Sequence, residues 1–185
     1  GDVAGHGVPA ALLMARLCSE TRYCLVTDII PSDAINSLNQ QLTKQTFSFF
    51  ITFALCVLDP IRHELTVVNA GHMPPLLRRA RTGEVEEIAA DISSPPLGID
   101  SGITYEQATI TLEPGDTVVM YTDGISECPS PAGTQYGIDR IRQMLANSTG
   151  ARDVTGRILK DVIAFTKGMP QEDDTCIVAF SRNAN

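Results

Sequence analysis

The amino-acid sequence predicts an α+β fold, in which helices and strands occupy separate stretches of the chain. Two helical segments come first, a run of strand segments follows, and two further helices precede a last strand. The helical segments carry apolar residues at helical spacing, whereas the strand segments are short and apolar, with several β-branched residues. Segregated elements of this kind favour α+β layers over a parallel βαβ sheet.

The first two helices are predicted from residue types and caps. Residues 9–26 are rich in Ala, Leu, Met and Arg, which favour helices, and neither Gly nor Pro follows until Pro31. Ser32 comes directly after this proline and is a residue type that caps helix N-termini. A second helix, capped by Ser32, is therefore expected to run to about Lys44.

Strands dominate the middle of the chain. Residues 50–58 form a nearly continuous apolar run, Asp59-Pro60 is a turn signal, and residues 65–69 follow closely, which predicts a hairpin. The other predicted strands are 75–77, 84–88, 108–112, 117–121 and 175–180. Two amphipathic helices are predicted at 137–147 and 153–166 by the spacing of their apolar residues.

Length and composition limit the classes of protein to which this chain can belong. The 185 residues predict one domain, residues 1–185, at about 150 residues per domain. The chain has 14 Lys and Arg against 22 Asp and Glu, a net charge of −8 that disfavours nucleic acid as a partner. No apolar run approaches the roughly 18 residues that would span a bilayer, so no membrane segment is expected.

The five cysteines are Cys18, Cys24, Cys56, Cys128 and Cys176. Their odd number, wide spread and lack of a CxxC pair argue against a disulfide framework and a thiolate zinc site. A reducing compartment, the cytoplasm, is expected. No signal peptide or initiator Met precedes Gly1, which indicates that the chain continues a longer protein.

Four stretches combine Asp, Gly or His at the ends of apolar elements. Three of them carry carboxylates that would repel one another on convergence unless a cation lay between them. Hard oxygen ligands would then favour Mg²⁺ or Mn²⁺ over zinc. Taken singly, each of these sites is better explained by turn chemistry. The stretches are Gly1-Asp2-Val3-Ala4-Gly5-His6-Gly7, Asn69-Ala70-Gly71-His72, Tyr121-Thr122-Asp123-Gly124 and Glu172-Asp173-Asp174-Thr175.

In this order the motifs resemble the SpoIIE/RsbU group, a bacterial branch of the PPM (type 2C-like) metal-dependent serine/threonine phosphatases. The resemblance extends over residues 1–178. It implies an α-β-β-α sandwich of two antiparallel sheets flanked by helices, with a centre of two Mn²⁺ or Mg²⁺ ions. It also implies metal-assisted attack of water on phosphoserine or phosphothreonine. The chain has no G-x-S-x-G nucleophile motif.

The same resemblance assigns site residues. Asp2 would be the ligand shared by both metals, and the Val3 carbonyl a further ligand. Asp123 and Asp173 would bind the second metal, supported by Asp174. His6 is a candidate proton donor beside the metals, whereas His72 is expected to brace a turn.

Two departures from the family pattern affect the expected structure. The family carries N-terminal strands before the Gly-Asp-Val segment, so here we expect one sheet to lack them and to have an open edge. Such an edge invites pairing with another chain, as in a homodimer. Cys176 stands where many relatives have Thr and is expected to pack in the interior.

Two functions are compatible with the sequence. The first is hydrolysis of phosphoserine on an anti-sigma-factor antagonist in a partner-switching pathway, with an upstream sensor or receiver domain attached. The alternative is a phosphatase-like binding module that holds metal too weakly for catalysis. The basic cluster at Arg78, Arg79 and Arg81 is interpreted as a solvated surface or as a docking patch for an acidic partner.

Overall fold

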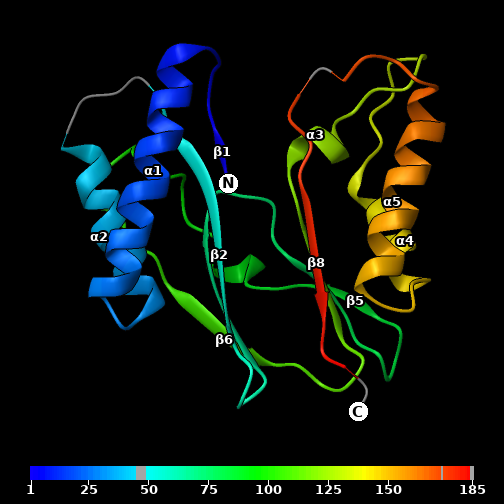
Figure 1. Cartoon of the computed structure of the whole chain (residues 1–185), viewed down its shortest axis with the longest axis horizontal. Helices are drawn as coiled ribbons and strands as arrows, with labels where there is room; N and C mark the ends of the chain where they lie inside the picture. Colours follow the sequence, from blue (N-terminus) through cyan, green and yellow to red (C-terminus); the bar gives the residue numbers. More distant parts are fainter. Residues whose placement is uncertain (45–48, 172, 184–185) are drawn as a thin grey trace. The chain divides into compact units, whose positions relative to one another are not determined.

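A computed structural model of the chain describes residues 1–44, 49–171 and 173–183 (Figure 1). The chain forms two compact units. Unit 1 contains Gly1–Pro74 and Ala89–Thr111, and unit 2 contains Pro75–Ile88 and Leu112–Asn185. Each unit has one four-stranded sheet in which all neighbours are antiparallel, together with helices. The predicted α+β class with two antiparallel sheets is confirmed.

The sheet of unit 1 has the strand order β1-β2-β3-β6. Its strands are β1 (Asp2–Val3), β2 (Ile51–Asp59), β3 (Glu64–Ala70) and β6 (Gln107–Thr111). Strands β2 and β3 form the predicted hairpin, and the Asp59 carboxylate accepts the backbone N–H groups of Ile61 and Arg62 in its turn, both at 2.9 Å. Strand β1 lies at one edge of this sheet. That this edge pairs with another chain stays a prediction.

Helices α1 (Val8–Thr27) and α2 (Pro31–Thr43) belong to unit 1, where they pack on each other and α2 contacts β3. Their inward side chains form a core with the sheet, including Leu13, Leu17, Ile35, Leu38, Ile51 and Val68. The predicted cap is wrong. Ile30 is the N-cap and Pro31 takes the first helical position, which suits its fixed φ. The Ser32 N–H is satisfied instead by Gln107 Oε1 of β6, at 3.0 Å.

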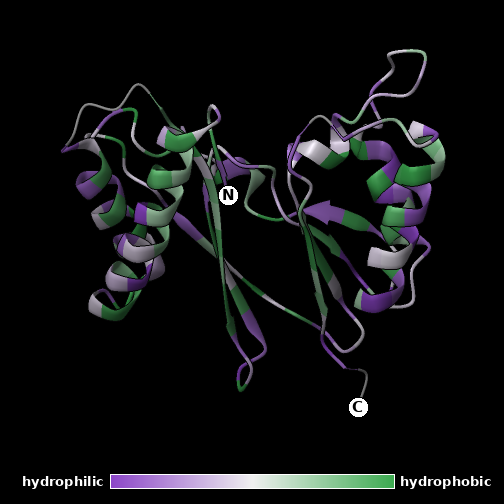
Figure 2. Cartoon of the chain, turned by 45° about the horizontal axis from the view of Figure 1, so that its top comes forward, coloured by the Kyte–Doolittle hydropathy of each residue, from purple (hydrophilic) through white to green (hydrophobic). Residues whose placement is uncertain are grey.

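The sheet of unit 2 has the order β5-β4-β7-β8. Its strands are β4 (Leu76–Arg78), β5 (Val85–Glu87), β7 (Thr117–Tyr121) and β8 (Ile177–Ser181). Helix α4 (Ile138–Ala146) contacts β4 and β5, whereas α5 (Ala151–Thr166) contacts β7 and β8. The helices of both units carry intermixed hydrophobic and hydrophilic residues (Figure 2), as expected for helices that cover a sheet.

Short elements escaped the sequence analysis. Strand β1, the helix α3 (Asp123–Ser126) and the 3₁₀ turn η1 (Ala90–Ile92) are each too short for apolar periodicity to show. The expectation that Cys176 packs in the interior is wrong. Cys176 lies just before β8, outside the sheet, and its side chain is exposed. All five cysteines are free. No helix in the described ranges has the length and apolarity to cross a bilayer.

The basic cluster mostly has partners within unit 2. Arg78 Nε donates to the Ala146 carbonyl at 3.1 Å, and Arg79 forms ion pairs with Asp116 at 2.9 Å and Glu86 at 2.7 Å. These arginines therefore tie strands and turns together, and only Arg81 fits the predicted solvated surface, with a side chain 79% exposed.

Candidate metal centre

The candidate ligand Asp123 stands where β7 gives way to α3 in unit 2. Strand β7 ends at Tyr121, Thr122 is the N-cap of α3, and Asp123 is its first helical residue. The Asp123 side chain is half-buried, and its Oδ1 accepts the N–H of Gly124 at 3.0 Å. The buried strand thus holds this carboxylate at a defined point, at the end of the central strand β7.

Thr122 fastens the segment that carries Asp173 to this point. Its Oγ1 donates to the Asp174 carbonyl at 3.1 Å and accepts the Cys176 N–H at 2.9 Å. Its own N–H donates to the Cys176 carbonyl at 3.1 Å. These three bonds extend the pairing of β7 with β8 beyond Tyr121, at the end of β7, and Ile177, at the start of β8. The segments that hold Asp123 and Asp173 therefore lie side by side.

Gly124 permits this close approach. A Cβ at Gly124 would lie 2.4 Å from the Asp174 carbonyl oxygen and 3.0 Å from its carbonyl carbon. Both atoms are backbone atoms held by the Thr122 bond, so they have little freedom to withdraw. Glycine is required here for space, and the Asp-Gly pair is more than turn chemistry.

The change Gly124→Ala is expected to lower the free energy of unfolding by roughly 1–3 kcal/mol, the usual cost of overpacking. Gly156→Ala is the matched control, because a Cβ at Gly156 in α5 meets nothing within 4 Å. The control should raise stability by up to about 1 kcal/mol through helix propensity. Urea denaturation of both variants measures the difference, and equal stability of the two would contradict the steric argument.

Asp173 and Asp123 share a lack of basic partners. Asp173 is exposed, its Oδ1 accepts the Asp174 N–H at 2.8 Å, and its carbonyl accepts Gln171 Nε2 at 2.6 Å. No ion pair joins either carboxylate to a basic side chain within the described ranges. Carboxylate oxygens without a basic partner suit a hard divalent cation.

Unit 2 alone does not complete a metal site. In the described part of each unit, no three His, Cys, Asp or Glu side chains lie close enough to hold a metal ion. The carboxylate oxygens of Asp123 and Asp173 fit a divalent metal ion in their chemistry but are only two of the ligands it needs. Further oxygen ligands would have to come from elsewhere in the chain or from water.

Asp2 occupies β1 in unit 1, opposite Thr52 of β2. Thr52 Oγ1 lies 3.5 Å from the Asp2 carbonyl oxygen and 3.0 Å from His72 Nδ1. The buried Asn69 holds His72 through two hydrogen bonds, from the His72 N–H at 2.9 Å and to the His72 carbonyl at 3.0 Å. The second sequence motif thus contacts β2 next to the strand of Asp2. The Asn69 side chain holds the turn at His72, whereas the His72 ring contacts Thr52, so the expected role of His72 in bracing the turn stays a prediction.

The Val3 carbonyl faces away from β2. Val3 lies opposite Ile51. The Ile51 N–H donates to the Leu97 carbonyl at 3.0 Å, and the Ile51 carbonyl accepts the Leu97 N–H at 2.8 Å, so both backbone groups of Ile51 point away from β1. The next residue, Ala4, donates its N–H to the Phe50 carbonyl at 2.9 Å. Hydrogen-bonded pairs alternate along antiparallel strands, so Val3 directs its carbonyl to the outer edge of β1. That orientation fits the predicted ligand role.

The predicted site residues are therefore divided between the units. Asp123 and Asp173, with Asp174, lie on adjacent segments of unit 2, whereas Asp2 and Val3 lie in unit 1. His6 is exposed in the loop before α1. Sequence reasoning missed Thr122 and Thr52, whose hydroxyl groups position these segments. The one signal for Thr122 was its place directly before an aspartate at the end of a strand.

The family model for Stage II sporulation protein E (SpoIIE) matches residues 1–183. The chain belongs to the SpoIIE family. This SpoIIE-family chain is 31% identical over 133 residues to phosphoserine phosphatase RsbU of Bacillus subtilis, a match that covers 71% of the chain and 39% of RsbU. It thus spans well under half of that relative.

Solved structures share the fold of this SpoIIE-family chain. The RsbU and RsbW domains of a Mycobacterium tuberculosis protein match with a TM-score of 0.75 and 24% identity, over 99% of the chain and 50% of that structure. The Mn-presoaked phosphatase domain of SpoIIE from Bacillus subtilis matches with a TM-score of 0.61 and 21% identity, over 91% and 74%. At these identities the likeness establishes the fold.

Proposed function

We propose that this chain is a phosphatase domain that hydrolyses phosphoserine or phosphothreonine on a regulatory protein with the help of divalent metal ions. The observation that carries the proposal is the Thr122 clamp, which holds the segments of Asp123 and Asp173 side by side. Membership of the SpoIIE family and the phosphoserine phosphatase RsbU among its relatives support it.

The proposed metal ligands are Asp2, the Val3 carbonyl, Asp123 and Asp173, with Asp174 in support, for a site of two Mn²⁺ or Mg²⁺ ions. All are oxygen donors, as these hard cations prefer. The Mn-presoaked SpoIIE structure supports this choice of metal. When bound, such ions lower the pKa of a water molecule and neutralise charge that develops on the phosphoryl group.

The chain's own residues position these groups. Asp123 and Asp173 supply negative charge that would repel a phosphate dianion, so substrate binding depends on the cations they hold. Thr122 fixes the distance between their two segments, and Thr52 with His72 braces the strand of Asp2. Rigid placement of ligands before the substrate arrives is what metal-assisted phosphoryl transfer requires.

The proposed substrate is a phosphorylated anti-sigma-factor antagonist-like protein in a partner-switching pathway. RsbU and the structure that contains RsbU and RsbW domains support this assignment. We further propose that residues 1–185 act as one phosphatase domain attached to an upstream sensor or receiver domain. The five free thiols support a cytoplasmic location.

Hydrolysis of p-nitrophenyl phosphate tests the proposed function directly. Turnover is expected with Mn²⁺, should stop with EDTA, and should return when Mn²⁺ is added in excess. Turnover that persists in EDTA would contradict metal dependence. An absence of turnover, together with calorimetry that detects no Mn²⁺ binding, would favour the alternative of a binding module.

A further inference from the structure

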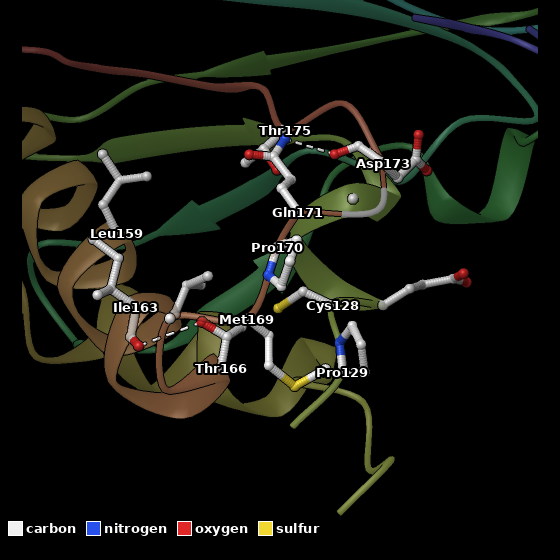
Figure 3. A pocket seen from close by; sticks show the side chains of 14 residues that line it. Cys128, Pro129, Leu159, Ile163, Thr166, Met169, Pro170, Gln171, Asp173 and Thr175 are labelled. Atoms are coloured by element: carbon white, nitrogen blue, oxygen red, sulfur yellow. Dashed lines mark hydrogen bonds between the residues drawn. The ribbon is translucent and has the colours of Figure 1, made fainter. Parts of the chain in front are cut away.

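A pocket of about 440 Å³ lies in unit 2 between α3, α5 and the segment before β8 (Figure 3). Leu159 and Ile163 of α5 and Met169 of the following loop face the same hollow as Cys128 and Pro129. Its volume is in the range of sites that take small ligands or single large side chains.

The pocket wall gathers apolar side chains that remain open to solvent. Leu159 is 42% exposed, Ile163 66% and Met169 38%. Val162, Pro129 and Pro170 extend the apolar surface. Burial raises the pKa of the Cys128 thiol, so this side chain is a neutral part of the wall at physiological pH. An exposed apolar cluster of this kind is favourable for binding an apolar group.

The pocket shares its wall with the candidate metal centre. Gly124 and Asp173 are both among its lining residues. A phosphate bound through cations at Asp123 and Asp173 would therefore lie beside this wall. Of the lining residues that the structure describes, the charged ones are Glu127 and Asp173, both acidic. Acidic groups of a ligand would be repelled here, whereas apolar groups would be accepted.

We propose that this pocket binds an apolar side chain of the phosphoprotein substrate, a few residues from the phosphoserine, and rejects an acidic side chain at that place. The inference rests on the proposed function and adds a determinant of substrate choice. The occupant is the substrate itself, because the pocket continues from the residues proposed to hold its phosphate. An extended chain advances about 3.3–3.6 Å per residue, so neighbours of the phosphoserine reach the pocket.

Synthetic phosphoserine peptides in a Gly/Ser background test the proposal. A single Leu, or a single Asp, is moved through each position on both sides of the phosphoserine, and kcat/KM is measured with Mn²⁺. Leu at one position should raise kcat/KM about tenfold through burial of its side chain, and Asp there should lower it. Ile163→Asp should abolish the gain from Leu, and Ile163→Met should retain it.

Two controls separate this pocket from general effects. Ile61→Asp alters a residue that is 89% exposed in the hairpin turn of unit 1 and should leave the preference for Leu unchanged. Hydrolysis of p-nitrophenyl phosphate, which carries no peptide, should be the same for Ile163→Asp and the unchanged chain. The unchanged hydrolysis would show that Ile163→Asp keeps its folded state and catalytic centre, and the Ile61→Asp result would show that a new surface aspartate elsewhere does not alter the preference.

The outcomes distinguish failure of the pocket from failure of the proposed function. The pocket assignment is overturned if Leu gives less than about a twofold gain at every position, or if the gain survives in Ile163→Asp. It is also overturned if Ile163→Asp alters only the oligomeric state measured by light scattering. Metal-dependent turnover of neither p-nitrophenyl phosphate nor any peptide would instead refute the proposed function.

Discussion

Asp123→Asn is expected to lower Mn²⁺-dependent kcat/KM for p-nitrophenyl phosphate by more than about 100-fold. Loss of a partner that merely orients a metal ligand costs about 10–100-fold, and loss of a ligand's charge should cost more. Asparagine keeps the shape of the side chain and an oxygen that can accept the Gly124 N–H, a bond of 3.0 Å in the structure. The local fold should therefore persist while the negative charge is lost.

Asp139→Asn is the matched control for that change. Asp139 is an exposed aspartate in the first turn of α4, also in unit 2, and has no proposed contact with metal. It should leave kcat/KM within about twofold. Calorimetric titration with Mn²⁺ should show weakened binding for Asp123→Asn alone. If Asp123→Asn keeps full activity and full Mn²⁺ affinity, Asp123 is not a ligand.

Asp116→Ala is expected to lower the free energy of unfolding by about 3 kcal/mol, the cost of removing one partner from a buried ion pair. The Asp116 side chain is 0% exposed and accepts Arg79 Nη1 at 2.9 Å. It also accepts the backbone N–H groups of Ala80 at 2.8 Å and Glu113 at 3.0 Å. Alanine would leave these donors without their acceptor, and an unsatisfied buried donor is costly.

Urea denaturation measures this loss, with Glu113→Gln as the control. Glu113 pairs with Arg81 at 4.0 Å, with side chains 55% and 79% exposed, so its contribution should be below about 1 kcal/mol. A loss for Asp116→Ala no larger than that of Glu113→Gln would show that Arg79 and the two N–H groups find other partners. The second ion pair of Arg79, with Glu86, is the contact that could compensate.

Local patterns predicted the longer elements well. The predicted strand 117–121 coincides with β7, and the predicted helix 9–26 differs from α1 by one residue at each end. These elements combine strong propensities with clear turn signals, so neighbouring residues suffice to define them. The Ser32 cap failed because the helix already begins at Pro31, with Ile30 as its N-cap. The Ser32 N–H bonds to Gln107, a partner far along the chain that no local pattern reveals.

The sequence analysis named candidate ligands for a metal site but not the contacts that hold their segments in place. Order and composition of the motifs led to Asp2, Asp123 and Asp173. That Gly124 must be glycine because the Asp174 carbonyl approaches it could not be read from the sequence. Likewise, the pairing of Arg79 with Asp116 turns an apparent surface cluster into internal support.

Residue order alone was enough for the α+β class and the longer helices and strands, because these depend on periodicity and residue type within short windows. The candidate carboxylates Asp2, Asp123 and Asp173 came from the resemblance to the SpoIIE/RsbU group and stay predictions. The fold in space was needed for the Thr122 clamp, the outward Val3 carbonyl and the pocket beside Asp173. Each of these joins segments that are distant along the chain. Hydrogen bonds and close contacts between such segments form only when the sheets assemble, and no local propensity encodes them.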